Sequence, residues 1–150
     1  MGSNQPWFVG QRAESLALIF LTRRPTLHVQ KMTADLGIDY LLAIGEAPSR
    51  YFGLQVKGAA KMSNLVGKSG HLIKTVAEPL QRYARDSAFP IAILAIDITS
   101  EAMLFGWIKA PAKSRLVSST SQTISMRPAT DKELDLAVQQ VNDWYDSGPR

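Results

Sequence analysis

Four polar residues stand where their side chains could hold a metal ion beside a reacting phosphate. Glu14 lies within an otherwise apolar stretch, and Asp39 stands at the start of an apolar run. Gln55 and Lys57 alternate with apolar neighbours, so they would lie about 7 Å apart on one face of a strand. Carboxylate and amide oxygens are the hard ligands that Mg²⁺ accepts. Because phosphodiester hydrolysis needs such a cation and an activated water, the four residues are candidates for that chemistry.

The hydrophobic pattern predicts the elements that must bring these residues together. Apolar residues recur at helical spacing on both sides of Glu14, whereas the residues around Gln55 alternate as in a strand with one apolar face. The predicted order is α-β-β-β-α-β-β-α, with helices at residues 6–22, 71–87 and 130–145 and strands at residues 26–32, 38–44, 51–57, 91–98 and 102–108.

This order predicts an α/β (α+β) chain with one mixed central sheet of about five strands flanked by helices. Residues 38–44 and 51–57 are joined by a short loop, so we expect them to pair as a hairpin. That pairing would bring Asp39 near Gln55 and Lys57.

Smaller local signals refine this prediction. Residues 58–70 are small, polar and basic, which is typical of a mobile loop. Pro79 is expected to kink or break the second helix, and Thr130 with Glu133 forms a capping box at the start of the last one. Asp97 is expected to cap the turn that follows the strand at residues 91–98.

Length and composition favour a single domain over residues 1–150, with a core at about 6–110 and a basic Ser/Thr-rich segment and helix at 110–150. The absence of cysteine excludes disulfides, thiolate zinc sites and cysteine nucleophiles. No apolar run is long enough to span a bilayer, and a cytoplasmic protein without membrane partners is expected. The net charge of +4 slightly favours a polyanionic partner.

The motifs carry a family resemblance when they are taken in order. They read Gln11-Arg12-Ala13-Glu14, Leu36-Gly37-Ile38-Asp39 and Leu54-Gln55-Val56-Lys57-Gly58. This combination resembles the PD-(D/E)XK nuclease superfamily, in particular its archaeal Holliday-junction-resolvase and Mrr-like branch and a group of prokaryotic domains with a Gln-x-Lys motif. The resemblance covers about residues 6–110, including a segment similar to that group's closing hairpin, and residues 110–150 match no family motif.

The resemblance implies a restriction-endonuclease-like fold and a DNA endonuclease of defence, restriction or repair that uses Mg²⁺ or Mn²⁺ and no organic cofactor. Asp39 would be the central metal ligand, and Glu14 would bind the metal directly or through water. The Gln55 amide oxygen and the Val56 main-chain carbonyl would complete the protein ligands. Lys57 would lower the pKa of the attacking water or stabilise charge on the phosphate. The expected partners are DNA and a second copy of the chain, since a homodimer supplies two sites for two strands.

Basic side chains beyond the motifs are candidates for the DNA backbone, because each phosphate contact adds to a salt-dependent affinity. These DNA-binding candidates are Lys61, Lys68, Lys74, Arg82 and Arg85.

Each candidate also has a simpler structural interpretation. Gln55 and Lys57 suit a solvated sheet face, Asp39 suits a turn, and Glu14 suits an ion pair with Arg12, Arg23 or Lys57. Asp35 competes with Asp39 as the metal carboxylate. The basic residues suit an ordinary solvated surface, and the three tryptophans, Trp7, Trp107 and Trp144, suit packing roles.

Gln55 stands where the commoner family pattern has an acid, so the site would carry two negative charges instead of three. The alternative function is therefore a catalytically inactive module with the nuclease fold that binds nucleic acid or a protein. A further alternative is one domain of a longer protein, with residues 110–150 as a docking arm.

Overall fold

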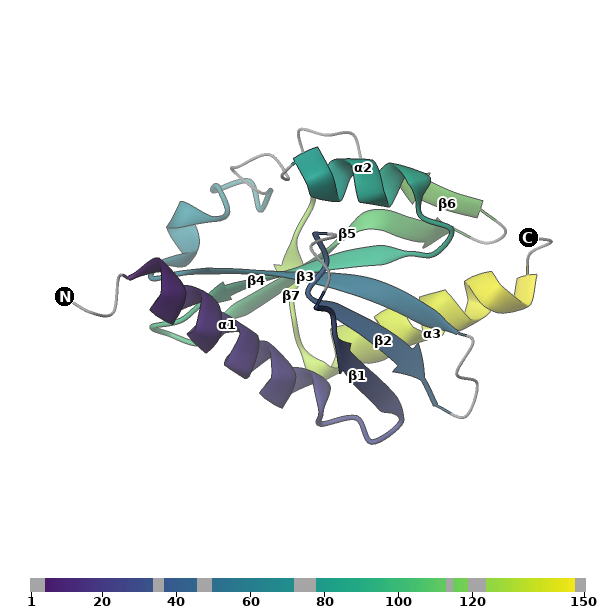
Figure 1. Ribbon diagram of the computed structural model, residues 1–150. Helices are drawn as coiled ribbons and strands as arrows, with labels where there is room; N and C mark the ends of the chain where they lie inside the picture. The colour runs from purple at the N-terminus through teal and green to yellow at the C-terminus, as the bar shows by residue number, and fades with distance from the viewer. Residues whose placement is uncertain are drawn as a thin grey trace.

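The computed structural model describes residues 5–33, 37–45, 50–71, 78–112, 115–118 and 124–147. A seven-stranded mixed sheet lies between helices on both of its faces (Figure 1). Helices α1 (Pro6–Leu21) and α3 (Asp131–Ser147) cover one face, and α2 (Glu78–Asp86) covers the other. The α+β class and the mixed sheet with flanking helices agree with the prediction from the sequence.

The strands follow the order β1-β2-β3-β4-β5-β6 across the sheet, and β7 also pairs with β5. The pair β3–β4 is parallel and the other pairs are antiparallel. The bounds are β1 (Leu27–Lys31), β2 (Tyr40–Ile44), β3 (Tyr51–Ala59), β4 (Ile91–Asp97), β5 (Met103–Ala112), β6 (Arg115–Ser118) and β7 (Arg127–Pro128). The expected hairpin of β2 with β3 is confirmed, with Tyr40 opposite Leu54.

The expected number of about five strands is wrong, because the segment after residue 110 adds two more. Strand β5 continues to Ala112 and offers its outer edge to both β6 and β7. These two strands are four and two residues long, too short to show the alternation by which a strand is recognised in a sequence.

The segment at residues 58–70 is tied to the sheet, in contrast to the mobile loop expected there. After β3 it forms a 3₁₀ turn, η2 (Met62–Asn64), and then buries Leu65 and Val66. Asp97 accepts a hydrogen bond of 3.0 Å from the Met62 N–H, and the Thr99 hydroxyl donates one of 2.8 Å to the Ala60 carbonyl. The anchors come from the turn after β4, which is distant in sequence, so local composition could not reveal them.

Pro79 does not break the described helix, because it lies in the first turn of α2. A proline is tolerated there, since its missing N–H would have no partner within the helix in any case. The earlier part of the predicted helix, residues 72–77, lies outside the described residues.

Helix α1 lies directly against β3. Its buried face comprises Ala13, Leu16, Ala17, Phe20 and Leu21. The approach is close at Gly58, where a Cβ atom would stand 2.5 Å from the Ala13 Cβ and 3.2 Å from the Val9 carbonyl oxygen. Only glycine at residue 58 allows α1 to pack this closely on β3. This packing distance also sets how far Glu14 lies from the sheet.

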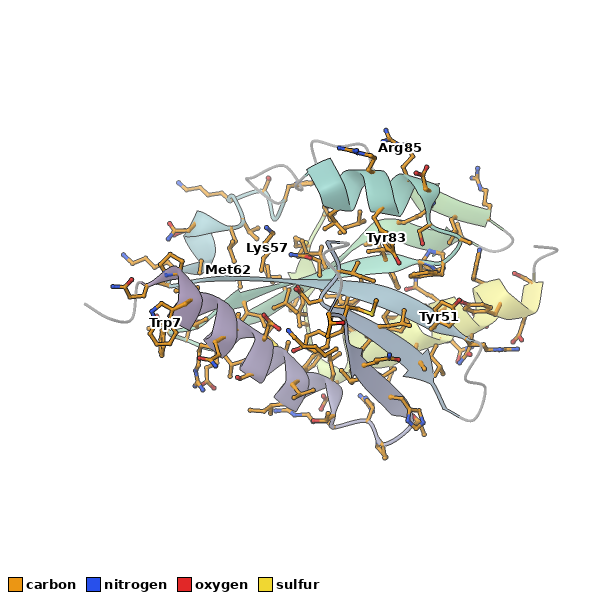
Figure 2. The ribbon with its side chains drawn as sticks, in the orientation of Figure 1. Trp7, Tyr51, Lys57, Met62, Tyr83 and Arg85 are labelled. Atoms are coloured by element: carbon orange, nitrogen blue, oxygen red, sulfur yellow. The ribbon has the colours of Figure 1, made fainter. Side chains whose placement is uncertain are left out.

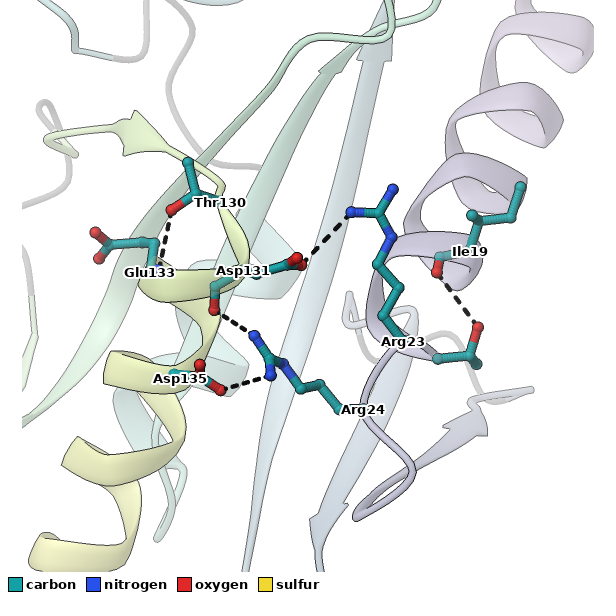
Figure 3. Close-up of polar contacts among 8 residues, drawn as sticks. Ile19, Arg23, Arg24, Thr130, Asp131, Glu133 and Asp135 are labelled. Carbon is teal, nitrogen blue, oxygen red and sulfur yellow. Dashed lines mark hydrogen bonds and ion pairs between the residues drawn. The ribbon is translucent and has the colours of Figure 1, made fainter.

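The end of α1 is also tied to the start of α3 (Figure 3). Arg24 donates a hydrogen bond of 2.6 Å to the Asp131 carbonyl and pairs with the Asp135 carboxylate at 3.0 Å. The Thr130 hydroxyl accepts the Glu133 N–H at 3.1 Å, which confirms one half of the expected capping box, but the Thr130 N–H donates to the Pro128 carbonyl and not to Glu133. The two helices on this face of the sheet therefore support each other.

No helix in the described part of the chain is long and apolar enough to cross a membrane.

Candidate active site

Asp39 lies immediately before β2, and its backbone is held from both sides. Its N–H donates to the Leu54 carbonyl at 2.8 Å, and its carbonyl accepts the Met32 N–H at 2.9 Å. Its carboxylate then accepts the Val56 N–H at 2.7 Å. The Asp39 carboxylate thus takes the place of a main-chain carbonyl as the acceptor for the Val56 N–H. This happens just before Tyr40, where the regular pairing of β2 with β3 begins.

The turn before Asp39 is fixed by Gly37. This glycine has a φ of 92°, in the left-handed region that side chains disfavour. A Cβ atom at residue 37 would stand 2.9 Å from the Cα and Cβ of Leu80 in α2. The Gly-x-Asp motif therefore combines a required backbone conformation with close packing, and both orient Asp39.

Burial raises the pKa of the Asp39 carboxyl above its ordinary value, and the negative charge of Glu14 acts in the same direction. The Val56 N–H and the positive charges of Lys31 and Lys57 oppose this effect on the pKa. Asp39 is thus a partly buried acid that interacts electrostatically with one acid and two ammonium groups. A cation placed there would relieve the cost of its charge.

Gln55 lies between the two β3 residues that Asp39 contacts. Its Nε2 atom donates a long, weak hydrogen bond of 3.4 Å to the Val56 carbonyl. Its Oε1 atom is buried and has no hydrogen-bond partner. An unsatisfied buried acceptor is costly, so this oxygen has the character expected of a ligand for a cation.

Lys57 lies two residues beyond Gln55 on the same face of β3. Val56 and Gly58 face α1, so alternation along the strand turns Lys57 toward the face that α2 covers (Figure 2). Its ammonium is close enough to lower the pKa of Asp39. Lys57 therefore approaches Asp39 from the face of the sheet opposite α1.

Glu14 approaches Asp39 from the α1 face. Its carboxylate forms an ion pair with Lys31 at the end of β1 and accepts a long contact of 3.4 Å from the Tyr40 hydroxyl. The Glu14 side chain is 32% exposed and the Lys31 side chain 57%. An ion pair of Glu14 was expected and is present, but with Lys31; of the expected partners, Arg12 pairs with Glu101 and Arg23 with Asp131.

Lys31 and Tyr40 are the site residues that sequence reasoning missed. They lie opposite each other in the β1–β2 register, with the Lys31 ammonium 5.3 Å from the centre of the Tyr40 ring. The hydrogen bond to Glu14 is the main cause that raises the pKa of Lys31, and burial raises that of Tyr40. The pairing could have been found by aligning strands 26–32 and 38–44 as a hairpin.

The structure therefore brings the four predicted residues to the gap at which β2 leaves β3. Asp39 lies in the gap, Glu14 reaches it from one side, and Gln55 and Lys57 lie on the other side. Glu14, Lys31 and Lys57 are all close enough to Asp39 to affect its pKa, whereas alternation along β3 puts Gln55 and Lys57 on the face of the sheet opposite Glu14. Among the described residues, no group of three or more His, Asp or Glu side chains forms a ready metal site.

The DNA-binding candidates spread over the part of the chain after β3. Lys61 and Lys68 are exposed around η2, and Arg82 and Arg85 are exposed on α2. Figure 2 shows Arg85 on the outer side of that helix. Lys74 and the competing acid Asp35 lie outside the described residues.

Comparisons of the chain with protein-family models, with curated proteins and with solved structures gave no match. Any functional assignment consequently depends on the geometry of this gap.

Proposed function

We propose that the protein is a divalent-metal-dependent DNA endonuclease with a restriction-endonuclease-like fold, of the PD-(D/E)XK type. The observation that carries this proposal is the position of Asp39 at the gap between β2 and β3, close to Glu14 on one face of the sheet and to Lys57 on the other, with the unpaired Gln55 oxygen on the Lys57 face. The order of elements and the pairing of β2 with β3 support the fold assignment.

The residues present fit a hard divalent cation such as Mg²⁺ or Mn²⁺. Asp39 and Glu14 would supply carboxylate oxygens, Gln55 its buried amide oxygen, and Val56 its main-chain carbonyl. All four are oxygen ligands, which is the set that these cations prefer. When bound, the metal would polarise the phosphate and favour ionisation of the attacking water.

The roles of the protein residues follow from their positions. Lys57 would place an ammonium beside the reacting phosphate and stabilise the charge that develops there. The Val56 N–H holds the Asp39 carboxylate in one orientation, so no rotation is needed before it binds. Lys31 would compete with a metal for the Glu14 carboxylate, because both cations are attracted to the same group.

Plasmid cleavage with Mg²⁺ or Mn²⁺ tests the proposal. The wild type should convert supercoiled plasmid to nicked and linear forms, whereas Asp39→Ala and Lys57→Ala should be slower by about 100-fold or more. Lys132→Ala removes an exposed lysine of α3 and should cleave at the wild-type rate. Cleavage that persists in both site variants, or a wild type inactive with both metals, contradicts the proposal.

The Glu14–Lys31 ion pair favours a second candidate function, a catalytically silent module of the same fold that binds nucleic acid. In such a module the pair would be a permanent structural contact and no metal would displace it. Wild-type DNA binding without cleavage, together with unfolding temperatures unaffected by Mg²⁺ and Mn²⁺, would identify this case.

A further inference from the structure

The outer face of α1 carries an exposed aromatic ring at the end that precedes the candidate site. Trp7 is 68% exposed, in contrast to Trp144, which is 5% exposed, and Trp107, which packs against the core. The packing role expected for all three tryptophans is therefore wrong for Trp7. Figure 2 shows Trp7 at the first turn of α1, at one end of the molecule.

Trp7 shares a stripe of α1 with Glu14. The two residues are seven apart, which is almost two helical turns, so their side chains leave the helix within about 20° of each other. The rise between them is about 10 Å. Gln11 lies between them on the same stripe and is also exposed. The indole and the candidate metal ligand thus face the same side of the helix.

The side chain of Trp7 is open to solvent. Its contact with Phe8 is edge-to-face, with ring centres 5.8 Å apart and planes at 85°. Two residues further on, the Val9 carbonyl lies over Gly58 at the end of β3. From there the chain leads within three residues to the exposed Lys61. The exposed ring of Trp7 suits an apolar base and the exposed Lys61 suits an anionic phosphate, which are the two parts of a nucleotide.

We propose that Trp7 is a stacking platform for an unpaired base, so that the substrate contains a single-stranded segment next to the scissile phosphate. A base within a duplex has both faces covered by its neighbours, and only an unpaired base can stack on a side chain. The distance of about 10 Å between Trp7 and Glu14 corresponds to about one to three nucleotides of strand. This inference rests on the proposed nuclease function and narrows its substrate class.

Binding of a 12-nucleotide thymidine strand in EDTA tests this inference without cleavage. Anisotropy of a labelled strand measures affinity, and intrinsic emission reports on Trp7, the most exposed indole. The wild type should bind the strand more tightly than a 12-base-pair duplex, with quenching of its emission. Trp7→Ala should bind the strand roughly 5- to 100-fold more weakly, as expected for loss of one stacked base, and Trp7→Phe should stay within a few-fold of the wild type.

Ile19→Ala is the matched control, because Ile19 is 57% exposed on α1 but lies off the stripe of Trp7 and Glu14. It should bind the strand as the wild type does. Equal affinity of Trp7→Ala and the wild type overturns the inference, as does a preference for the duplex or no binding of the strand. Emission that responds to lipid vesicles and not to the strand also overturns it.

The outcome is separate from that of the plasmid assay. Metal-dependent cleavage that needs Asp39 and Lys57, without any effect of Trp7, would reject the platform alone. Strand binding that needs Trp7, without cleavage of either the plasmid or the strand with Mg²⁺ or Mn²⁺, would reject the catalytic proposal and keep the binding surface.

Discussion

The Asp39 carboxylate accepts a hydrogen bond of 2.7 Å from the main-chain N–H of Val56, the residue between Gln55 and Lys57. The Gln-x-Lys motif and the Gly-x-Asp motif are thus joined by a bond between the middle residue of one and the acid of the other. The bond needs only the backbone donor of Val56, whose side chain packs in the core on the α1 face. It fixes the orientation of the acid and leaves the neighbouring side chains free for a ligand.

Asp39→Asn is expected to stabilise the metal-free protein at neutral pH. Burial raises the pKa of Asp39, so the stability that it contributes is fully present below its ordinary pKa of 3.8 and is lost as the pH rises through the raised value. Asparagine removes the charge and keeps an oxygen for the Val56 N–H. We expect a gain of about 1 kcal/mol or less in the free energy of unfolding at pH 7, measured in urea. A loss of stability at pH 7 would contradict this account of Asp39.

Gly58→Ala is expected to destabilise the protein by about 1–3 kcal/mol, because the new methyl group would meet Ala13 at 2.5 Å and force α1 away from β3. Since α1 carries Glu14, activity should fall as well. Gly10→Ala is the matched control on the same helix: nothing lies within 4 Å of its Cβ, and it should stabilise by about 0.5–1 kcal/mol. Thermal unfolding of both variants measures the difference in their stability. Similar stability of Gly58→Ala and Gly10→Ala would show that α1 can shift away from β3 without cost.

The parts of the fold that the sequence predicts well are those with a local cause. The alternation at residues 51–57 predicts β3, and the short connection to β2 predicts their pairing, because both signals lie within a few residues. The anchoring of Met62 by Asp97 was not predicted, since it joins residues 35 positions apart. The partner of Glu14 was also missed, because Lys31 reaches Glu14 only through the register of β1 on β2. The sequence was enough to select candidate side chains for the site. The residues that contact them could not be predicted, because those contacts form only in the tertiary fold.

Lys31→Met is expected to increase the affinity for Mg²⁺ or Mn²⁺, because the Lys31 ammonium occupies the carboxylate of Glu14 that the metal would need. Both partners are partly exposed, so the competing interaction is weak and the gain should be about two- to fivefold in Kd. A metal titration followed by the unfolding temperature measures it. Lys132→Met on α3 is the control and should respond as the wild type does. Unchanged or weaker metal binding in Lys31→Met would mean that Glu14 is not a ligand.

Asp97→Ala is expected to loosen the attachment of η2 to the turn after β4. The Asp97 carboxylate accepts N–H groups from Met62 at 3.0 Å and from Thr99 and Ser100 at 2.9 Å each. Partial burial acts to raise the pKa of Asp97, but the three donors together hold it below its ordinary value. The stability from this depressed pKa is present above 3.8 and is lost as the pH falls through the lowered value.

Loss of these bonds should cost about 2–3 kcal/mol at pH 7, and Asp97→Asn should recover part of it, because the amide oxygen still accepts. Hydrogen exchange at the Met62 amide provides a local measurement, and this amide should exchange faster in Asp97→Ala while the amides of β4 next to β3 change less. If the wild type and the Asp97→Ala variant lost stability equally between pH 5 and pH 3, the carboxylate would not be the group that anchors η2. Because Lys61 directly precedes the anchored Met62, DNA affinity in Asp97→Ala should fall together with the protection of the Met62 amide.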